Sequence, residues 1–289
     1  MAVVGGQRTR AEVTVSDLQR ERLAYKRFRS RRSTVVALLS TLAFAAVAYA
    51  TITGAPGWPR VRDSFFDVES AWRALPAVLE GLWLNLRVLL VCGVLILVLA
   101  LGVAALRTLR GPVWFPVRAL ATAYVDLFRG MPLILTLYLV GFGLPALRLT
   151  GVPNDYVVLG GAALVLTYTA YVAEVFRAGI ESVHPSQVAA ARSLGLGPRR
   201  TLRLVVLPQA VRRVLPALLN DFVALQKDCG LISVLGAVDA VRAAQIEQAR
   251  TFNFTPYVLA GLLFVLLAVP SARFADAMAR RAERREGRR

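Results

Sequence analysis

The chain has 289 residues, of which 56% are hydrophobic and 18% are charged. Soluble domains carry roughly 25% charged residues and disordered chains are more polar still, so the composition argues against both. The formal charge of +17 would suit a nucleic-acid binder, but a mean hydropathy of +0.56 indicates too much apolar surface for one. The sequence therefore predicts an integral membrane protein.

Six segments are long and apolar enough to cross a bilayer, which takes about 20 residues per helix. The fifth is the weakest because charged residues interrupt it, so we expect it to lie inside a helical bundle. The first ends in Ala48-Tyr49-Ala50, which resembles a signal-peptidase site, but its length favours a helix that is retained. We predict an all-α integral membrane protein with six transmembrane helices, at residues 33–59, 88–106 (apolar back to 82), 130–147, 156–173, 204–238 and 251–272.

Basic residues alternate along the chain in a way that predicts the orientation of these helices. The excess of Arg and Lys lies in 1–32, 107–118, 177–203 and the segment from Arg273 onward, and together these carry the whole net charge. The alternate connections, such as 60–76, are neutral. Because basic loops stay on the cytoplasmic side of a membrane, we expect both termini to be cytoplasmic.

Residues that could hold a metal or a cofactor are scarce. The chain has two cysteines, Cys92 and Cys229, and one histidine, His184, with no spacing typical of a zinc site. No glycine-rich phosphate-binding loop accompanies the longest cytoplasmic connection. We therefore predict that this chain is not an enzyme and binds no metal or cofactor, and that any ATP is hydrolysed on a partner chain.

The connection between the fourth and fifth predicted helices contains a short helix. Ala and Leu, which have high helix propensity, dominate residues 187–194. Pro185 and Ser186 are typical of a helix start, and Gly195 with Gly197 is typical of a helix end. Small side chains on such a helix would let another protein approach closely, although an ordinary re-entry turn would fit the same residues.

This connection resembles the EAA loop of the permease subunits of type I ABC importers. Ala189-Ala190-Ala191, Gly195, Val205 and Leu207-Pro208 lie in register with that family's pattern. More narrowly, the chain is similar to the polar amino acid permeases. That similarity covers about residues 77–281 and is carried by the sequences at 79–86, 126–133, 170–180, 207–210 and 227–228.

The resemblance implies an organisation and a set of site residues. It implies a five-helix permease core at 77–281 with a coupling loop at 185–208, between a first helix at 33–59 and a basic tail at 282–289. A basic cytoplasmic tail at 1–32 would precede the first helix. The residues expected to contact an ATPase are Gln187, Ala189, Ala190, Ala191, Gly195, Leu207 and Pro208.

The resemblance also implies a function and partners. The chain would be the transmembrane permease subunit of an importer for a polar amino acid or a close analogue, in the bacterial plasma membrane. Two permease subunits, identical or paired with a sister, would form the pathway. Two ATP-binding subunits holding ATP and Mg²⁺ would dock on the coupling loops, and an extracytoplasmic solute-binding protein would deliver the substrate. The choice of amino acid stays open.

The chain departs from the family pattern at two places. The first residue of the EAA motif is an acid in the family and is Ala189 here, so shape and backbone contacts must carry more of the docking. The family's K-D-T-S-L reads Lys227-Asp228-Cys229-Gly230-Leu231, which lacks two hydroxyl groups near the expected pathway.

Charged residues at membrane depth face a cavity, form pairs or lie near the interface. Glu174 and Arg177 are spaced i, i+3, as are Asp126 and Arg129, and this spacing favours ion pairs. A gating role is the alternative for Arg129.

The fifth predicted helix carries the candidate translocation pathway, at Asn220, Gln226, Lys227 and Asp228. Asn220 and Lys227 share one helix face, which could line a pathway or contact another helix equally well. An ion-coupled secondary transporter or channel that acts without an ATPase is the leading alternative function, and a structural membrane protein is the third.

Overall fold

The computed structural model describes residues 17–109, 111–151 and 153–285, and every regular element in these ranges is helical. Residues 1–16 and 286–289, which belong to the two predicted basic tails, lie outside the described residues. The chain divides into two compact units, one that ends at Val61 and one that begins at Arg62.

The first unit contains helix α1 (Asp17–Thr53), which includes the first predicted membrane segment. Ser33–Thr53 is a 21-residue stretch of mean hydropathy 2.1, long enough to cross a bilayer. The helix ends at Thr53, short of the predicted Pro59, because Gly54 and Pro56 follow. Its large apolar side chains are exposed within this unit, as expected for a helix that crosses a membrane.

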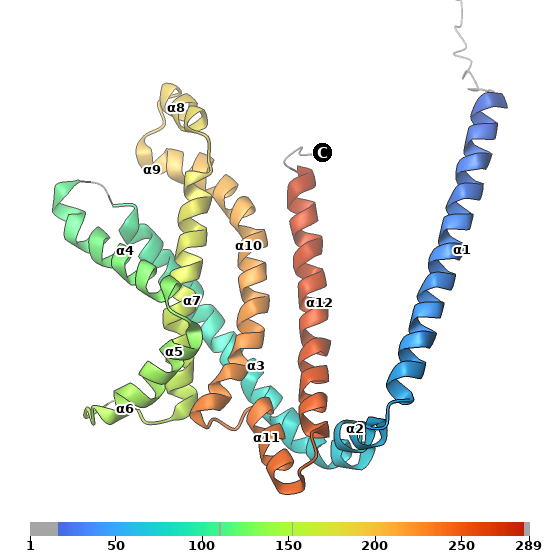
Figure 1. The fold of residues 1–289 in the computed structure, drawn as a ribbon. Helices are drawn as coiled ribbons and strands as arrows, with labels where there is room; N and C mark the ends of the chain where they lie inside the picture. Colours follow the sequence, from blue (N-terminus) through green and yellow to red (C-terminus); the bar gives the residue numbers. More distant parts are fainter. Residues whose placement is uncertain (1–16, 110, 152, 286–289) are drawn as a thin grey trace, which may run out of the picture. The chain divides into compact units, whose positions relative to one another are not determined.

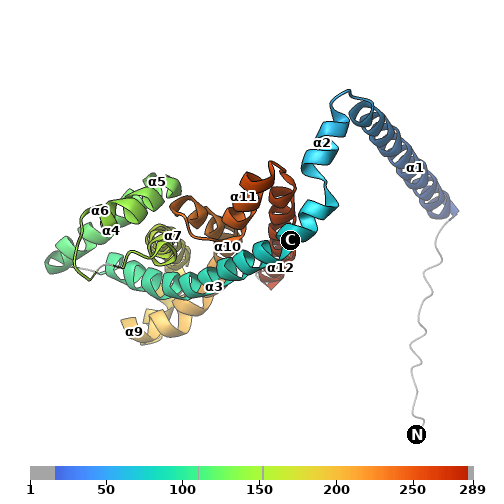
Figure 2. The ribbon, with the colours of Figure 1, turned by 90° about the horizontal axis from the view of Figure 1, so that it is seen from below.

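Helix α2 (Trp58–Phe65) crosses the division between the units, and the rest of the second unit is a helical bundle (Figures 1 and 2). Figure 1 shows α8 and α9 at one end of this bundle, here termed the α8 end, and α11 at the other, the α11 end. The bundle helices are α3 (Val68–Arg107), α4 (Phe115–Gly130), α5 (Leu133–Tyr138), α6 (Leu144–Ala146), α7 (Tyr156–Glu181), α8 (Pro185–Ser193), α9 (Pro198–Thr201), α10 (Leu207–Asp228), α11 (Ala240–Thr251) and α12 (Thr255–Arg285). Short 3-10 segments lie at Pro112–Trp114 and Cys229–Leu235, and π-helical turns at Leu139–Gly143 and Leu202–Val206.

Among the described residues, four helices could each cross a membrane alone, and the number rises to six if two bent pairs each make one span. The third predicted span, 130–147, is wrong as a single helix. Helix α4 runs to Gly130, and the following α5–α6 segment bends away by 108°, since Pro132 cannot continue the backbone hydrogen bonds. If this bent pair makes one span, it begins at Pro112. A search for uncharged windows does not find α4, because Asp126 and Arg129 interrupt it.

The fourth and fifth predicted spans also differ from the structure in their bounds. Helix α7 continues eight residues beyond the predicted Ala173, to Glu181. The ion pair between Glu174 and Arg177 lowers the free-energy cost of having both charges in the helix. The fifth is a pair, Pro198–Leu235 followed by Ala240–Thr251, bent by 48°.

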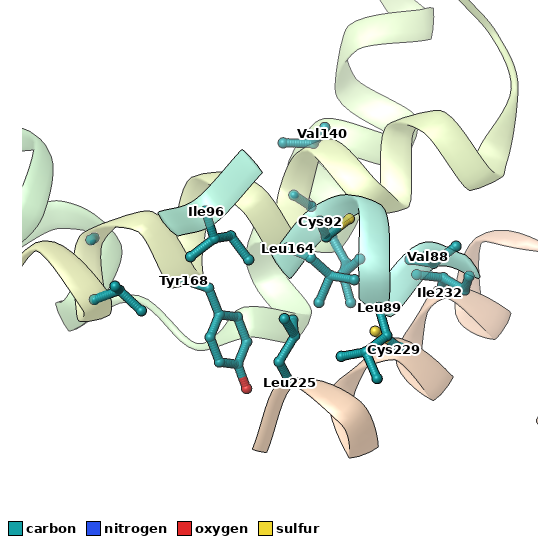
Figure 3. Close-up of a cluster of buried hydrophobic side chains, with 14 of the residues drawn as sticks. Val88, Leu89, Cys92, Ile96, Val140, Leu164, Tyr168, Leu225, Cys229 and Ile232 are labelled. Carbon is teal, nitrogen blue, oxygen red and sulfur yellow. The ribbon is translucent and has the colours of Figure 1, made fainter. Parts of the chain in front are cut away.

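The core of the second unit lies where α3, α7 and the segment around Cys229 meet. Glycines allow the closest approaches: a Cβ added to Gly160 would lie 2.8 Å from Ile232, and one added to Gly141 would lie 2.4 Å from Leu235. The 3-10 segment after α10 is therefore fitted against α7 and the π-helical turn. Figure 3 shows the buried side chains of this cluster, among them Val88, Leu89, Cys92, Ile96, Val140, Leu164, Tyr168, Leu225, Cys229 and Ile232.

A polar contact fastens α3 to the start of α11. The side-chain amide of Asn85 donates to the carbonyl oxygen of Cys229 at 3.1 Å and to a carboxylate oxygen of Asp239 at 3.0 Å. Its amide oxygen accepts from the backbone N–H of Ala240 at 3.1 Å. One turn earlier, Gly81 lies so close that an added Cβ would stand 2.3 Å from the carbonyl carbon of Asp239. The bend between α10 and α11 is held by this contact.

Candidate functional site

Helix α8 forms at the predicted coupling segment, at the α8 end of the bundle. His184 caps it, since its ring Nδ1 accepts a hydrogen bond from the backbone N–H of Ser186 at 3.2 Å. The helix ends at Ser193, and Gly195 then takes a left-handed backbone conformation, with φ of +79°. A non-glycine residue at this position would be strained.

The outer face of α8 presents small side chains. Ala189 and Ala190 are exposed, whereas Ala191 is buried against the rest of the unit. The missing acid of the family motif would therefore stand on the exposed face, where Ala189 leaves an uncharged, shallow surface. Of the other expected coupling residues, Gln187, Leu207 and Pro208 are exposed.

Glu174 on α7 is the centre of an ion-pair cluster drawn from three helices. Its carboxylate lies 2.6 Å from the guanidinium of Arg107 on α3 and 2.5 Å from that of Arg177 on α7. Arg129, at the end of α4, lies 3.8 Å from the same carboxylate. Arg177 also pairs with Glu181. We term this group the Glu174 cluster.

The i, i+3 pair of Glu174 with Arg177 forms as its spacing predicts. Arg129 also forms an ion pair, but its partner is Glu174 and not the expected Asp126. Arg129 lies on the last turn of α4, where it approaches Glu174, and no ion pair with Asp126 is found among the described residues. Sequence reasoning missed Arg107. Its position as the first residue of the basic connection 107–118 could have identified it. The side chain of Arg107 is 10% exposed, and its ion pair with Glu174 joins α3 to α7.

The structure separates the four candidate pathway residues of α10. Asn220 and Lys227 are exposed along one side of the helix, whereas Gln226 is buried. Asp228 accepts a hydrogen bond of 2.7 Å from the hydroxyl of Tyr168 on α7. Gln226 and Asp228 therefore lie toward the interior of the unit, and Asn220 and Lys227 lie on its surface.

A cavity of about 330 Å³ lies between α3, α7 and α10. Apolar side chains line most of it, and its polar members are Tyr168 and Asp221. One carboxylate oxygen of Asp221 is buried and has no hydrogen-bond partner within the described part of the chain. A buried, unpartnered carboxylate oxygen is costly, so a hydrogen-bond donor or a positive charge that reached Asp221 would stabilise it.

Sequence reasoning noted Asp221 as a charge within the fifth segment and missed its cavity. One feature of the sequence could have pointed to this cavity. Asn220 and Asp221 are adjacent polar residues, so they lie on different faces of one helix and cannot both face the same surroundings. The described ranges bring no three His, Cys, Asp or Glu side chains together as a metal site would require.

The two residues that depart from K-D-T-S-L lie in the core. Cys229 is fully buried, and a Cβ added to Gly230 would meet the ring of Phe264 at 3.2 Å. These positions pack the 3-10 segment after α10 against neighbouring helices. The two hydroxyl groups that the chain lacks would therefore lie in the core and not on the surface.

Comparison with known proteins gives a consistent family. Residues 97–284 match the family described as the inner membrane component of binding-protein-dependent transport systems. The chain is 34% identical over 206 residues to the arginine transport system permease protein ArtQ of Bacillus subtilis, covering 70% of this chain and 91% of ArtQ. It is 36% identical over 173 residues to the probable glutamine ABC transporter permease GlnM of the same organism, covering 59% of this chain and 77% of GlnM.

Solved structures show the same architecture. A chain of the crystal structure of an amino acid ABC transporter with histidines superimposes with a TM-score of 0.69 at 31% identity, covering 74% of this chain and 98% of that one. A chain of the inward-facing MetNI methionine ABC transporter gives a TM-score of 0.54 at 21% identity, covering 72% and 97%, and shows likeness of fold.

Proposed function

We infer that this chain, which belongs to the family of inner membrane components of binding-protein-dependent transport systems, is the permease subunit of an ABC importer for amino acids. The observation that carries the inference is the family match over 97–284. Relatives named for arginine and glutamine transport and the amino acid transporter structure support the substrate class. As a transport subunit, the chain itself is not a catalytic enzyme.

We propose that the chain crosses the bacterial inner membrane six times, with the α8 end and both termini in the cytoplasm. Four helices that could each cross the membrane, together with two bent pairs taken as one span each, would make six crossings. The basic connections lie at the α8 end, where the positive-inside rule would place the cytoplasm. In this topology Ser33–Thr53 is the first helix and the remaining five form the core.

We propose that α8 docks one of two ATP-binding subunits, which carry ATP and Mg²⁺. A second permease subunit would complete the pathway, and a solute-binding protein would load it from outside. The exposed alanines of α8 would fit a groove on the ATPase. The backbone conformation of Gly195 would set the direction in which the chain leaves that groove.

Replacing Gly195 with Asp should abolish ATP-driven uptake while leaving membrane insertion intact. The φ of +79° disfavours a side chain, although the space around it is open within this unit, and a carboxylate would stand at the docking face. Uptake into proteoliposomes and co-purification of the ATPase would measure this. Normal uptake by the variant would contradict docking through α8. Gly151→Asp is the matched control, because Gly151 also has a positive φ and open space around it but lies in the loop before α7, away from α8.

The cavity beside Asp221 is the proposed place where a substrate amino group rests during passage. Asn220, Gln226, Lys227 and Asp228 do not line this cavity and are proposed to contact the substrate elsewhere along the route. The amino group of an amino acid supplies both the positive charge and the donors that the buried oxygen of Asp221 lacks. The cavity lies between α10 and two other helices, so relative movement of the helices would open or close it.

Replacing Asp221 with Asn should reduce uptake about tenfold, because a charge-assisted hydrogen bond would become a neutral one. The assay is uptake of labelled amino acid at saturating binding protein. The exposed Asp276 of α12 offers a matched control, since Asp276→Asn removes the same charge away from the cavity. Equal uptake by the two variants would exclude the cavity from the pathway.

The function itself is tested by reconstituting the chain with its ATPase and a solute-binding protein. We expect uptake that requires ATP and that rises when the binding protein is loaded with an amino acid. Uptake driven by an ion gradient without any ATPase would instead establish the alternative of a secondary transporter.

A further inference from the structure

A side-chain contact joins α8 to the first turn of α10. The amide nitrogen of Gln209 on α10 donates to the side-chain oxygen of Gln187 on α8 at 2.5 Å. The same nitrogen donates to the carbonyl oxygen of Val205 at 2.9 Å. Because an amide has two N–H groups, both donors of Gln209 are used. We term this contact the Gln187–Gln209 clasp.

The chain between the two glutamines is built to bend. Gly195 adopts φ of +79°, and Gly197 follows two residues later. The π-helical turn Leu202–Val206 comes next, and Pro208 lacks the N–H that would restore the regular helical pattern. Hinge residues are often small and lie in loops or at the ends of helices, and π-helical turns are frequent at functional sites. This segment would therefore absorb a displacement of α8 along the backbone.

Apolar packing does little to hold α8 on the bundle. Ala191 is the one buried residue of this helix. A cavity of about 890 Å³ lies between α8 and the ends of α3, α7 and α10. A push on α8 therefore reaches α10 poorly through side-chain packing, and the clasp offers a direct connection.

The turn of α10 beyond the clasp is firmly attached to α7. One turn after Gln209, the guanidinium of Arg213 donates to the backbone and side-chain oxygens of Ser182, which follows α7. A Cβ added to Gly179 would lie 2.0 Å from Val214, so the two helices are in close contact. Whatever moves Gln209 moves this part of the bundle and the helix that carries Asp221.

We propose that Gln209 is a positioning residue for transport, which transmits the displacement of α8 to α10 by bridging the bendable segment between them. This rests on the proposed function, because the displacing force comes from docked ATP-binding subunits. Through the clasp, each position that α8 takes would set a position of α10. ATP binding to the docked subunits could then favour one packing of the bundle over another.

The direction of the hydrogen bond gives a sharp test. Gln209 is the donor and Gln187 the acceptor, so Gln187→Glu keeps an acceptor oxygen, whereas Gln209→Glu removes both donors and faces two acceptor oxygens. In proteoliposomes with the full complex, we expect Gln209→Glu to lower the amino acid transported per ATP hydrolysed roughly threefold to tenfold. Gln187→Glu keeps the acceptor but changes the charge of the docking helix, so the matched control is the same exchange on α11, Gln245→Glu, which should keep that ratio within about twofold of the unchanged chain.

Two further variants separate transmission from folding. Gln187→Met breaks the clasp from the exposed side of α8 and should lower the same ratio with a normal yield of complex. The double variant Gln187→Lys, Gln209→Glu places a donor opposite the carboxylate and should restore the ratio. A structural role alone would lower complex yield and ATPase activity together and leave transport per ATP unchanged.

The outcomes distinguish this inference from the proposed function. If the unchanged chain shows no ATP-driven uptake, the proposed function fails. If it transports and both Gln209→Glu and Gln187→Met keep the full ratio of transport to hydrolysis, the clasp does not transmit the movement and the inference is overturned.

Discussion

Replacing Glu174 with Gln is expected to destabilise the bundle by about 3 kcal/mol, the cost of removing one partner from a buried ion pair. The Glu174 side chain is 19% exposed, and its carboxylate pairs with Arg177 and with Arg107, whose side chain is 10% exposed. Gln would leave two poorly solvated guanidinium groups facing a neutral amide, with Arg129 nearby. Helices α3, α4 and α7 would lose their common anchor. The measurement is the Tm of the purified chain in detergent.

The matched control is Glu69→Gln on α3. Glu69 pairs with Arg73 at 2.8 Å, but its side chain is 82% exposed, so its loss should change the Tm little. Within the cluster, Arg107→Gln should cost more than Arg129→Gln, since Arg129 lies farther away and is 43% exposed. Equal Tm values for Glu174→Gln and Glu69→Gln would show that the cluster does not stabilise the fold.

Replacing Gly81 with Ala is expected to destabilise the bundle by about 3 kcal/mol, at the upper end of the cost of overpacking. The added Cβ would lie 2.3 Å from the carbonyl carbon of Asp239 and 2.4 Å from the backbone nitrogen of Ala240. Both are backbone atoms, so no side chain can turn away. Helix α3 must then separate from α11, which also breaks the hydrogen bonds of Asn85.

Gly102→Ala tests the same exchange on the same helix. No atom lies within 4 Å of a Cβ added to Gly102, and alanine is the better helix former by about 1 kcal/mol. This variant should keep or raise the Tm, whereas Gly81→Ala should lower it. A neutral Gly81→Ala would mean that α3 and α11 are not in the close contact described.

The class of fold follows from the sequence, because apolar windows and alternating basic loops are properties of the chain alone. The bounds of α4 and α7 could not be predicted in the same way. Both helices carry charges that pair only in three dimensions: Arg129 approaches Glu174 on another helix, and Glu174 also takes Arg107 from a third. A search for uncharged windows counts each of these as an interruption.

Some features of the candidate site could likewise be predicted from the sequence, and others could not. Short-range signals placed α8 correctly, since Pro185, Gly195 and the capping position act within one or two turns. The partners of Gln209 and Asp221 depend on how α8, α7 and α10 come together, which spacing along one helix does not encode. Asp221 was visible as a charge, but its cavity required the structure.

Both cysteines of the chain are reduced and lie in the main core, Cys92 at 4% and Cys229 at 0% exposure. Thiol-reactive labels should therefore leave the folded chain unmodified, so its natural thiols need not be removed before labelling experiments. A cysteine introduced on α8 or α10 would then report its own accessibility during the transport cycle. Reaction of Cys92 or Cys229 would report something else, the separation of α3 and α7 from the segment after α10.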